Sequence, residues 1–360
     1  MASHGIPRAE GRGEQSAEAR AKELKEINQY KRLVDEIDIK VDAGEFTPEL
    51  LQKTAELLKK NPEYYTIWNH RRRIYANEFR DLASQVKDGK LSEEERQSQV
   101  LDIVKLDLQF LFPLLLKFPK CYWIWNHRLW LLDQSTLLLP RETSHKLWTE
   151  ELALVGKMLS RDSRNFHGWG YRRTVITNLE NLDETSMAQK ELDYTTKMIS
   201  ANLSNFSAWH NRSKLIIRTL AEQQAEDDER KRMLDEELKL IHKALFDPYD
   251  QSLWFYHQNL MCCLDPATAP RTMAPNLSTD ERLAYVSEEQ DFIEELLEDT
   301  DDCKWIYQSL IELAFLQAKL RGLDIEAERR GSLKEWLQKL KSLDSLRMGR
   351  WTDLESLLLA

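Results

Sequence analysis

The sequence predicts an all-α protein, an α-solenoid in which antiparallel helical hairpins stack into a superhelix. A motif centred on tryptophan recurs along the chain, and this repetition is the main observation behind the prediction. Glycine and proline are also scarce, with 11 and 10 among 360 residues, too few for the many tight turns of an all-β fold. Hydrophobic residues make up 42% of the chain, enough for a continuous core between stacked hairpins.

Five tryptophans mark the copies of this motif. The markers are Trp68, Trp125, Trp169, Trp209 and Trp254, separated by 57, 44, 40 and 45 residues. The most complete copy spans 120–128, near-copies span 63–71, 164–172 and 204–212, and weaker copies lie at 249–257 and 304–307. Helical-hairpin repeats occupy roughly 34 to 47 residues, so the last three spacings fit two helices and two turns per copy, and the first is longer.

Before the first marker, the sequence predicts a tail and two helices. Residues 1–18 are polar and rich in Gly, Ala, Ser and Glu, which is typical of a flexible N-terminal tail. Apolar residues then recur at helical spacing over 19–41 and again over 50–60, which ends at Asn61-Pro62. We interpret 19–360 as a single helical-repeat domain.

Partner helices are predicted between the markers and after the last of them. Their ranges are 99–118, 145–160, 187–201, 229–246, 280–299 and 333–359. Asn, Asp, Ser or Pro precedes each marker helix, as helix caps and turns require. Three prolines make 266–279 the strongest interruption, and we expect a loop there.

In each of the first four copies, an aromatic residue lies three positions before the tryptophan and an arginine lies three positions after it. Residues three apart share one face of a helix. Packing explains this pattern, with the tryptophan between hairpins and the arginine against the next unit. His70, His127 and His210 are likewise expected to pack or to form hydrogen bonds. Periodicity alone therefore predicts a scaffold and names no substrate.

Composition and motifs exclude several classes of function. The net charge of −10 argues against binding to nucleic acid. The four cysteines form no Cys-x-x-Cys pair, which argues against a zinc site and favours reduced thiols in the cytoplasm. The most apolar run, 108–118, is too short to span a membrane, and no secretory signal is recognisable. Phosphate-binding loops, dinucleotide fingerprints and hydrolase motifs are absent.

The pattern Asn/Pro-x-x-Tyr/Phe-x-x-Trp-x-x-Arg resembles the α-subunit repeat of protein prenyltransferases, from about residue 61 to 257. In that family the α subunit is a helical array, similar to tetratricopeptide repeats, that wraps a β subunit. The β subunit holds the catalytic zinc and the isoprenoid. The resemblance therefore implies a heterodimer whose zinc is bound by the β subunit, with no metal held by this chain alone.

The third copy, 162–173, is similar to that of the type II enzymes, the Rab geranylgeranyltransferases. Arg164 and Phe166 stand where the α subunit shared by farnesyltransferase and the type I enzyme has Lys and Tyr. The fifth copy and His4-Gly5 favour type II as well. The short loop 266–279 lies where larger type II subunits carry an immunoglobulin-like insertion. The resemblance thus implies a compact form without that domain or a leucine-rich-repeat domain.

This resemblance implies transfer of geranylgeranyl from its diphosphate to C-terminal cysteines of Rab GTPases presented by an escort protein. Two alternatives remain open at the level of the sequence. One is the α subunit shared by farnesyltransferase and geranylgeranyltransferase type I. The other is a non-catalytic helical-repeat adaptor that binds peptides.

Lys120 is the first candidate site residue, because the family's α subunit reaches the active site with a lysine in the pattern Pro-Lys-x-Tyr, here 119–122. The resemblance implies that this cation stabilises the departing diphosphate, where negative charge builds up in the transition state. The equivalent place in the other copies is held by Glu63, Arg164 and Ser204, so Lys120 departs from the repeat.

Five further residues are expected at or near the site by the same resemblance. His167 matches a histidine that approaches the diphosphate, and Tyr122 and Asn165 line the mouth of the site. Arg164 adds positive charge there or forms an ion pair at the subunit interface. His4, in the tail, is a candidate weak and displaceable ligand of the partner's zinc.

Overall fold

The computed structural model describes residues 16–323 and 327–359, and every regular element in these ranges is a helix. The prediction of an all-α repeat fold is confirmed. The chain divides into two compact units, Met1–Thr185 and Ser186–Ala360. The predicted tail 1–18 lies mostly outside the described residues. No helix in the described ranges has both the length and the apolar composition that crossing a membrane requires.

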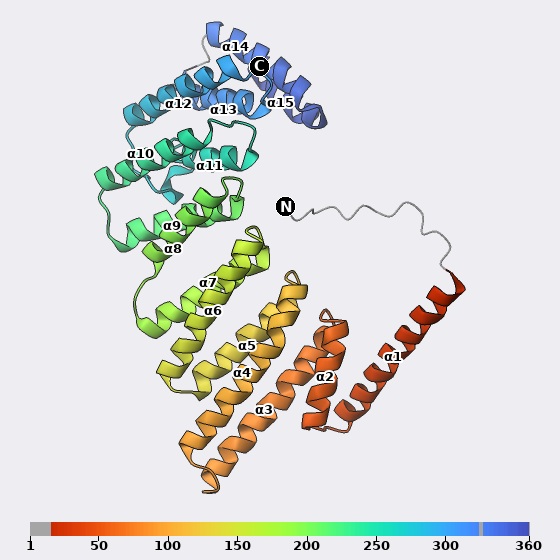
Figure 1. Ribbon diagram of the computed structural model, residues 1–360. Helices are drawn as coiled ribbons and strands as arrows, with labels where there is room; N and C mark the ends of the chain where they lie inside the picture. The colour runs from red at the N-terminus through yellow and green to blue at the C-terminus, as the bar shows by residue number, and fades with distance from the viewer. Residues whose placement is uncertain (1–15, 324–326, 360) are drawn as a thin grey trace. The chain divides into compact units, whose positions relative to one another are not determined.

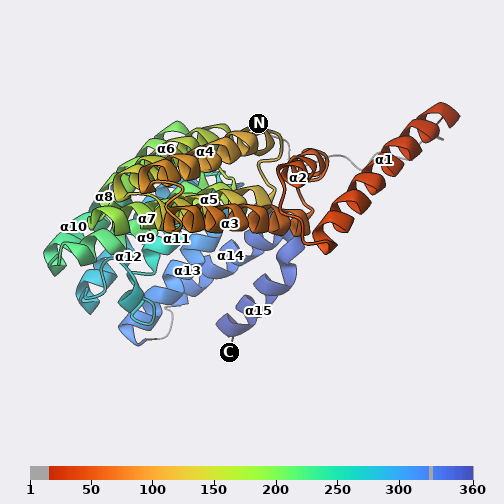
Figure 2. The same cartoon turned by 90° about the horizontal axis from the view of Figure 1, so that it is seen from below.

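Consecutive helices of the first unit pack as antiparallel hairpins, and the turns before α3, α5 and α7 lie at the same end of the unit (Figure 1). Its helices are α1 (Ala17–Asp42), α2 (Pro48–Lys60), α3 (Tyr65–Lys87), α4 (Glu93–Lys117), α5 (Tyr122–Leu138), α6 (Arg141–Arg161) and α7 (Phe166–Asp183). Helix α1 packs on α2, and most of its length extends beyond that contact (Figure 2).

The second unit continues the pattern, with α8 packed on α9, α12 on α13 and α13 on α14. Its helices are α8 (Ala188–Ala201), α9 (Phe206–Glu222), α10 (Asp227–Ala244), α11 (Gln251–Met261), α12 (Thr279–Asp299), α13 (Lys304–Arg321), α14 (Ala327–Leu343) and α15 (Met348–Leu359), with short 3₁₀ turns at Ala269–Arg271 and Ser345–Arg347. Five of the six predicted partner-helix ranges fall on single helices, with ends shifted by up to six residues. The sixth prediction, one helix over 333–359, is wrong, because the 3₁₀ turn at Ser345–Arg347 divides this range between α14 and α15.

The predicted loop 266–279 is a packed connection between α11 and α12. Arg282 is buried and donates hydrogen bonds to three backbone carbonyls, those of Cys263, Pro275 and Leu277. Arg230 donates to another carbonyl of the loop, that of Met273. A guanidinium is planar and carries five donors. These two arginines therefore hold the loop against helices α10 and α12, on which they lie.

Each marker tryptophan closes the turn that precedes its helix. The indole N–H donates to the carbonyl six residues earlier, over 2.7–2.9 Å, in the pairs Trp68–Pro62, Trp125–Pro119, Trp169–Ser163, Trp209–Leu203 and Trp254–Pro248. In the weak sixth copy, the Tyr307 hydroxyl donates to Asp301 O over 2.7 Å. Tyr307 therefore has the marker's role there, and the recurring tryptophan is a turn-closing donor as well as a core residue.

The recurring arginine forms a buried ion pair with an acid on the following helix. The pairs are Arg71–Asp107, Arg128–Glu151 and Arg212–Glu237, and His257–Glu289 replaces them in the fifth copy. A residue two positions after the next marker bonds to the same carboxylate: His127 to Asp107, Tyr171 to Glu151 and Tyr256 to Glu237. Each carboxylate thus joins successive hairpins, which supports the predicted scaffold role of these arginines.

Candidate functional site

The predicted site residues lie in and beside two turns at one end of the first unit. Lys120 belongs to the turn before α5, and Tyr122 is the first residue of that helix. Arg164 and Asn165 belong to the turn before α7, and His167 is in its first turn. Helices α5 and α7 contact each other, so the two turns are neighbours. The structure brings together residues that are more than 40 positions apart in the sequence.

Asn165 ties the two turns together. Its Oδ1 accepts the backbone N–H of Gly168 over 3.0 Å, which caps α7, and its Nδ2 donates to Pro119 O over 3.0 Å. The same carbonyl of Pro119 accepts the indole N–H of Trp125 over 2.9 Å. Asn165 is only 4% exposed, so both ends of its amide are used inside the protein. It sets the position of the backbone next to Lys120.

Close packing of α7 on α6 also depends on Gly168. A Cβ at this position would lie 3.0 Å from Leu159 Cδ2, tighter than ordinary van der Waals contact. The absent side chain allows the first turn of α7, which carries His167, to approach α6. Steric contact with Leu159 therefore explains why the third copy has a glycine at this position.

The ammonium group of Lys120 stays accessible. Its side chain is 54% exposed, and Nζ lies 3.8 Å from Asp162 Oδ2 at the end of α6. A contact of this length between exposed groups holds little free energy. It leaves the positive charge at the surface beside the turn that leads to His167.

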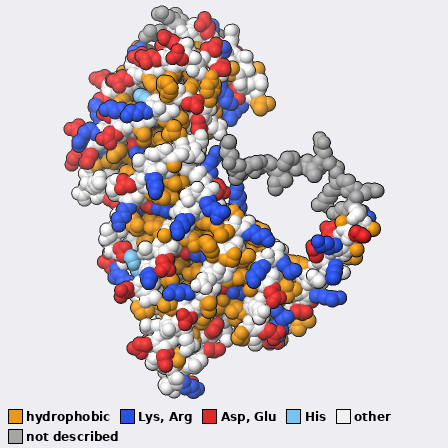
Figure 3. All heavy atoms as spheres, viewed as in Figure 1, with side chains coloured by type: hydrophobic (Ala, Val, Ile, Leu, Met, Phe, Trp, Pro, Cys, Tyr) orange, Lys and Arg blue, Asp and Glu red, His pale blue; other side chains and the backbone are white. Residues whose placement is uncertain are grey.

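The aromatic rings of Tyr122 and His167 lie together on this surface. Their centroids are 6.0 Å apart with planes at 50°, and His167 also contacts the ring of Phe166 at 5.8 Å. Tyr122 is 49% exposed and Phe166 80% exposed, which is unusual for large aromatic side chains. Over the first unit, Figure 3 shows hydrophobic side chains with both basic and acidic side chains among them. The exposed rings near the Lys120 ammonium group suit a ligand that has an apolar part and an anionic part.

Comparisons with known proteins identify the family of this chain. The protein prenyltransferase alpha subunit repeat matches residues 48–78, 105–135, 148–179 and 188–219. The geranylgeranyl transferase type-2 subunit alpha of Schizosaccharomyces pombe is 34% identical over 363 residues, which cover 98% of this chain and 97% of that relative. The chain belongs to the geranylgeranyl transferase type-2 alpha subunits.

Other relatives of this type-2 alpha subunit give the same assignment. The Saccharomyces cerevisiae type-2 alpha subunit is 39% identical over 254 residues, 70% of each chain. The human one is 33% identical over 287 residues, which cover 79% of this chain and 46% of the human one. These names favour type II over the α subunit shared with farnesyltransferase and over a non-catalytic adaptor.

A solved structure shows the same fold as this type-2 alpha subunit. The protein geranylgeranyltransferase-I of Candida albicans, complexed with GGPP, has a chain that superposes with a TM-score of 0.61 and 21% identity. The match covers 92% of the present chain and 91% of that chain. The likeness supports the fold of the helical array.

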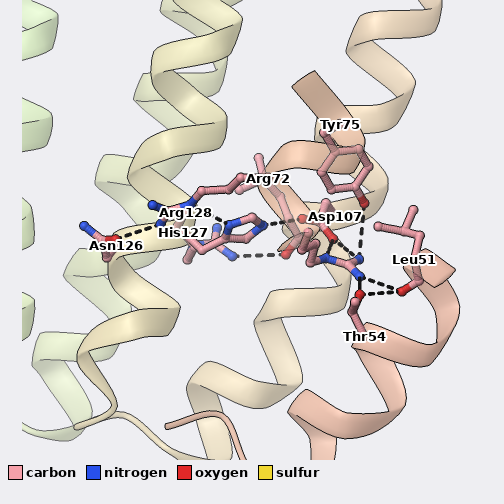
Figure 4. A network of polar contacts seen from close by, with 10 residues as sticks. Leu51, Thr54, Arg72, Tyr75, Asp107, Asn126, His127 and Arg128 are labelled. Atoms are coloured by element: carbon pink, nitrogen blue, oxygen red, sulfur yellow. Dashed lines mark hydrogen bonds and ion pairs between the residues drawn. The ribbon is translucent and has the colours of Figure 1, made fainter. Parts of the chain in front are cut away.

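The type-2 alpha subunit brings two residues to the site that the repeat pattern did not single out. Asn126 Nδ2 donates to the Tyr122 hydroxyl over 3.3 Å, and Arg72 Nη2 donates to Asn126 Oδ1 over 2.7 Å. Figure 4 shows Arg72 between Asn126 and His127. Each occupies an ordinary place in its repeat, directly after a recurring arginine or a marker tryptophan. No departure from the pattern could have indicated them.

Of the remaining candidates, Arg164 is exposed and forms no ion pair with the described residues. His4 lies outside the described residues. Within 16–323 and 327–359, no group of three His, Cys, Asp or Glu side chains is arranged to hold a metal ion. All four cysteines are free thiols, at positions 121, 262, 263 and 303.

Proposed function

We propose that this chain, paired with a β subunit, transfers geranylgeranyl from geranylgeranyl diphosphate to C-terminal cysteines of Rab GTPases presented by an escort protein. The observation that carries the proposal is the similarity to a type-2 alpha subunit over nearly the whole of both chains. The adjoining turns of Lys120, Tyr122 and His167 supply a surface suited to the diphosphate. Free thiols are consistent with a cytoplasmic site of action.

The proposed reaction requires that the departing diphosphate anion be stabilised. The C1–O bond of the lipid diphosphate breaks, and its electron pair leaves on the diphosphate oxygen. The sulfur of the cysteine thiolate, which has lost its proton, forms the new C–S bond. Lys120 is the cation that faces the developing charge, and fixed donors stabilise that charge more in the transition state than in the ground state.

The other site residues support the same step. His167 and Tyr122 offer N–H and O–H donors to the diphosphate oxygens. Asn165 holds the backbone of the Lys120 turn, as its hydrogen bond to Pro119 O indicates. Arg164 adds positive charge at the mouth of the site or forms an ion pair with the partner subunit.

The metal of the pair is proposed to be a zinc ion held by the β subunit. The described residues of this chain offer no arrangement suited to it. Bound there, zinc would stabilise the thiolate of the acceptor cysteine. His4 remains a proposed weak ligand that the tail could bring to it.

The first prediction tests Lys120 in the assembled heterodimer. Lys120→Ala should lower the rate constant of lipid transfer to a Rab–escort complex by roughly 100-fold, because a fixed donor to the developing anion is lost. The measurement is single-turnover transfer of geranylgeranyl after co-expression with a β subunit.

Lys146→Ala is the matched control, because Lys146 is exposed near the opposite end of α6. Wild-type transfer by Lys120→Ala would remove the catalytic assignment. Efficient farnesyl transfer to a short C-terminal peptide by the same heterodimer would favour the shared α subunit. A stable monomer that ignores β subunits would favour an adaptor.

A further inference from the structure

A chain of hydrogen bonds leads from the scaffold to the candidate site. It begins at Arg72 on α3, whose Nη2 donates to Asn126 Oδ1 over 2.7 Å. Asn126, on α5, donates from Nδ2 to the hydroxyl oxygen of Tyr122 over 3.3 Å. Helices α3 and α5 are in contact, so two successive hairpins contribute to the chain.

The direction of every bond in this chain follows from the chemistry of Arg72. A guanidinium only donates, so the atom of Asn126 that faces it must be the carbonyl oxygen. The amide nitrogen of Asn126 therefore faces Tyr122 and donates, and the phenol oxygen accepts. The hydroxyl hydrogen of Tyr122 is left for another acceptor, and no described residue accepts it. The half-exposed phenol thus presents its O–H outward.

Arg72 is itself held in place by a second branch. Its Nε donates to His127 Nδ1 over 3.2 Å, and its guanidinium lies 5.8 Å from the ring centroid of Trp130. Because His127 Nδ1 accepts, Nε2 carries the proton and donates to Asp107 Oδ2 over 2.7 Å. Burial lowers the pKa of His127, and with the charges of Arg71 and Arg72 it outweighs the opposing effect of Asp107. This direction agrees with an Nδ1 that accepts from Arg72.

The charge of Arg72 is not balanced by a carboxylate. Its hydrogen-bond partners among the described residues are the neutral Asn126 and His127. Burial lowers the pKa of Arg72, yet a guanidinium stays charged at neutral pH. The positive charge of Arg72 is therefore separated from the Tyr122 hydroxyl only by the side chain of Asn126. It favours the binding of an anion to that hydroxyl.

We propose that Arg72 and Asn126 are positioning residues that hold the Tyr122 hydroxyl as a hydrogen-bond donor to the diphosphate of the isoprenoid substrate. This inference rests on the proposed function. Of these three residues, only Tyr122 touches the substrate. Arg72 and Asn126 act through it by fixing which way the phenol hydrogen points.

Asn126→Asp tests the direction of the hydrogen bonds with almost no change of shape. Both oxygens of the new carboxylate accept, so Arg72 keeps its partner while the Tyr122 hydroxyl turns inward to donate to that carboxylate in place of the substrate. We expect the single-turnover rate constant to fall roughly 10- to 100-fold, as in Tyr122→Phe, because one hydrogen bond to a charged group is lost. The melting temperature of the heterodimer should be unchanged or higher, since Arg72 gains an ion pair.

The double variant Tyr122→Phe/Asn126→Asp separates this effect from simple charge repulsion. If Asn126 acts through the hydroxyl, the double variant should be no slower than Tyr122→Phe alone. If the new carboxylate only repels diphosphate, Asn126→Asp should cause its full loss in the Tyr122→Phe background as well, and the inference would be overturned. Asn126→Leu, which removes the amide without adding charge, should show the same lack of additivity.

Asn69→Asp is the matched control, because Asn69 has the same place in the first copy, is exposed and forms no hydrogen bond with described residues. It should transfer lipid at the wild-type rate. Lys120→Ala distinguishes the two levels of the argument. If Lys120→Ala transfers lipid normally, the proposed function of the site fails. If Lys120→Ala is slow while Asn126→Asp is normal, only the positioning role fails.

Discussion

Asp107 is held between two hairpins by an arginine and a histidine. It is 1% exposed, and it pairs with Arg71 and accepts a hydrogen bond from His127. Burial alone would raise the pKa of this carboxyl, but Arg71 and His127 outweigh burial and lower it well below its usual value. Asp107 is therefore a charged residue whose partners make burial tolerable.

Asp107→Asn should destabilise the protein by about 3 kcal/mol or more, because Arg71 would remain buried without its counter-charge. The free energy of unfolding in urea measures this. Asp102→Asn, at an exposed position of the same helix, is the control and should change stability by less than about 0.5 kcal/mol. Equal effects of the two substitutions would contradict a special role of the buried pair.

At the scale of the helix and the turn, a few side-chain hydrogen bonds hold the structure in place. The indole N–H of each marker tryptophan closes the turn before its helix, and in the second copy that turn carries Lys120. In the fifth copy, Glu289 of α12 accepts from His242 of α10 and His257 of α11. Such hydrogen bonds fix the ends and the register of neighbouring helices. The bond of Trp125 thereby helps to set the position of the turn that carries Lys120.

Trp125→Phe should lower the free energy of unfolding by about 1–3 kcal/mol, because the bond to Pro119 O and part of the buried volume are lost. Trp123→Phe is the comparison, since Trp123 is half-buried and forms no hydrogen bond with described residues through its indole. Urea unfolding of both variants gives the difference. A loss in Trp123→Phe as large as that in Trp125→Phe would assign the effect to size alone.

Glu289→Gln should change how stability depends on pH. Burial opposes the charged form of Glu289, but hydrogen bonds from His242 and His257 outweigh it and lower its pKa to about 2 from 4.5. A carboxyl whose pKa is lower in the folded state contributes stability above its unfolded pKa and loses it as pH falls through the folded one. The advantage of wild type over Glu289→Gln should therefore be complete above about pH 4.5 and shrink towards pH 2.

Urea unfolding at a series of pH values measures this advantage. Glu288→Gln, at the neighbouring exposed position, serves as the control. An advantage of wild type that stays constant down to pH 3 would show that Glu289 does not carry the lowered pKa.

At the scale of the whole molecule, the candidate site is built within one compact unit. Arg72, Lys120, Tyr122, Asn126 and His167 all belong to Met1–Thr185. In a repeat array each hairpin contacts its neighbours, so stability is close to a sum over adjacent pairs. The site therefore depends on three successive hairpins, those of α3, α5 and α7, and on the contacts between them.

The sequence by itself determined the helical repeat, the places of its turns, the family and the exception at Lys120. These depend on residue types at fixed short spacing, which a helix converts directly into a face or an end. Pairing between hairpins was decided only by the tertiary structure. Arg71, Arg128 and Arg212 pair with acids that lie 36, 23 and 25 residues later in the sequence. This separation differs from copy to copy, so the sequence pattern does not indicate the partner.

The relay from Arg72 to Tyr122 belongs to this second kind. Arg72 and Asn126 are 54 residues apart and look like ordinary members of their copies. Their contact arises because α3 packs on α5 in one register, which brings a donor-only group against an amide. Local spacing determines where a side chain lies on its own helix. Only the packing of helices determines which group it meets, and hence which way the Tyr122 hydroxyl points.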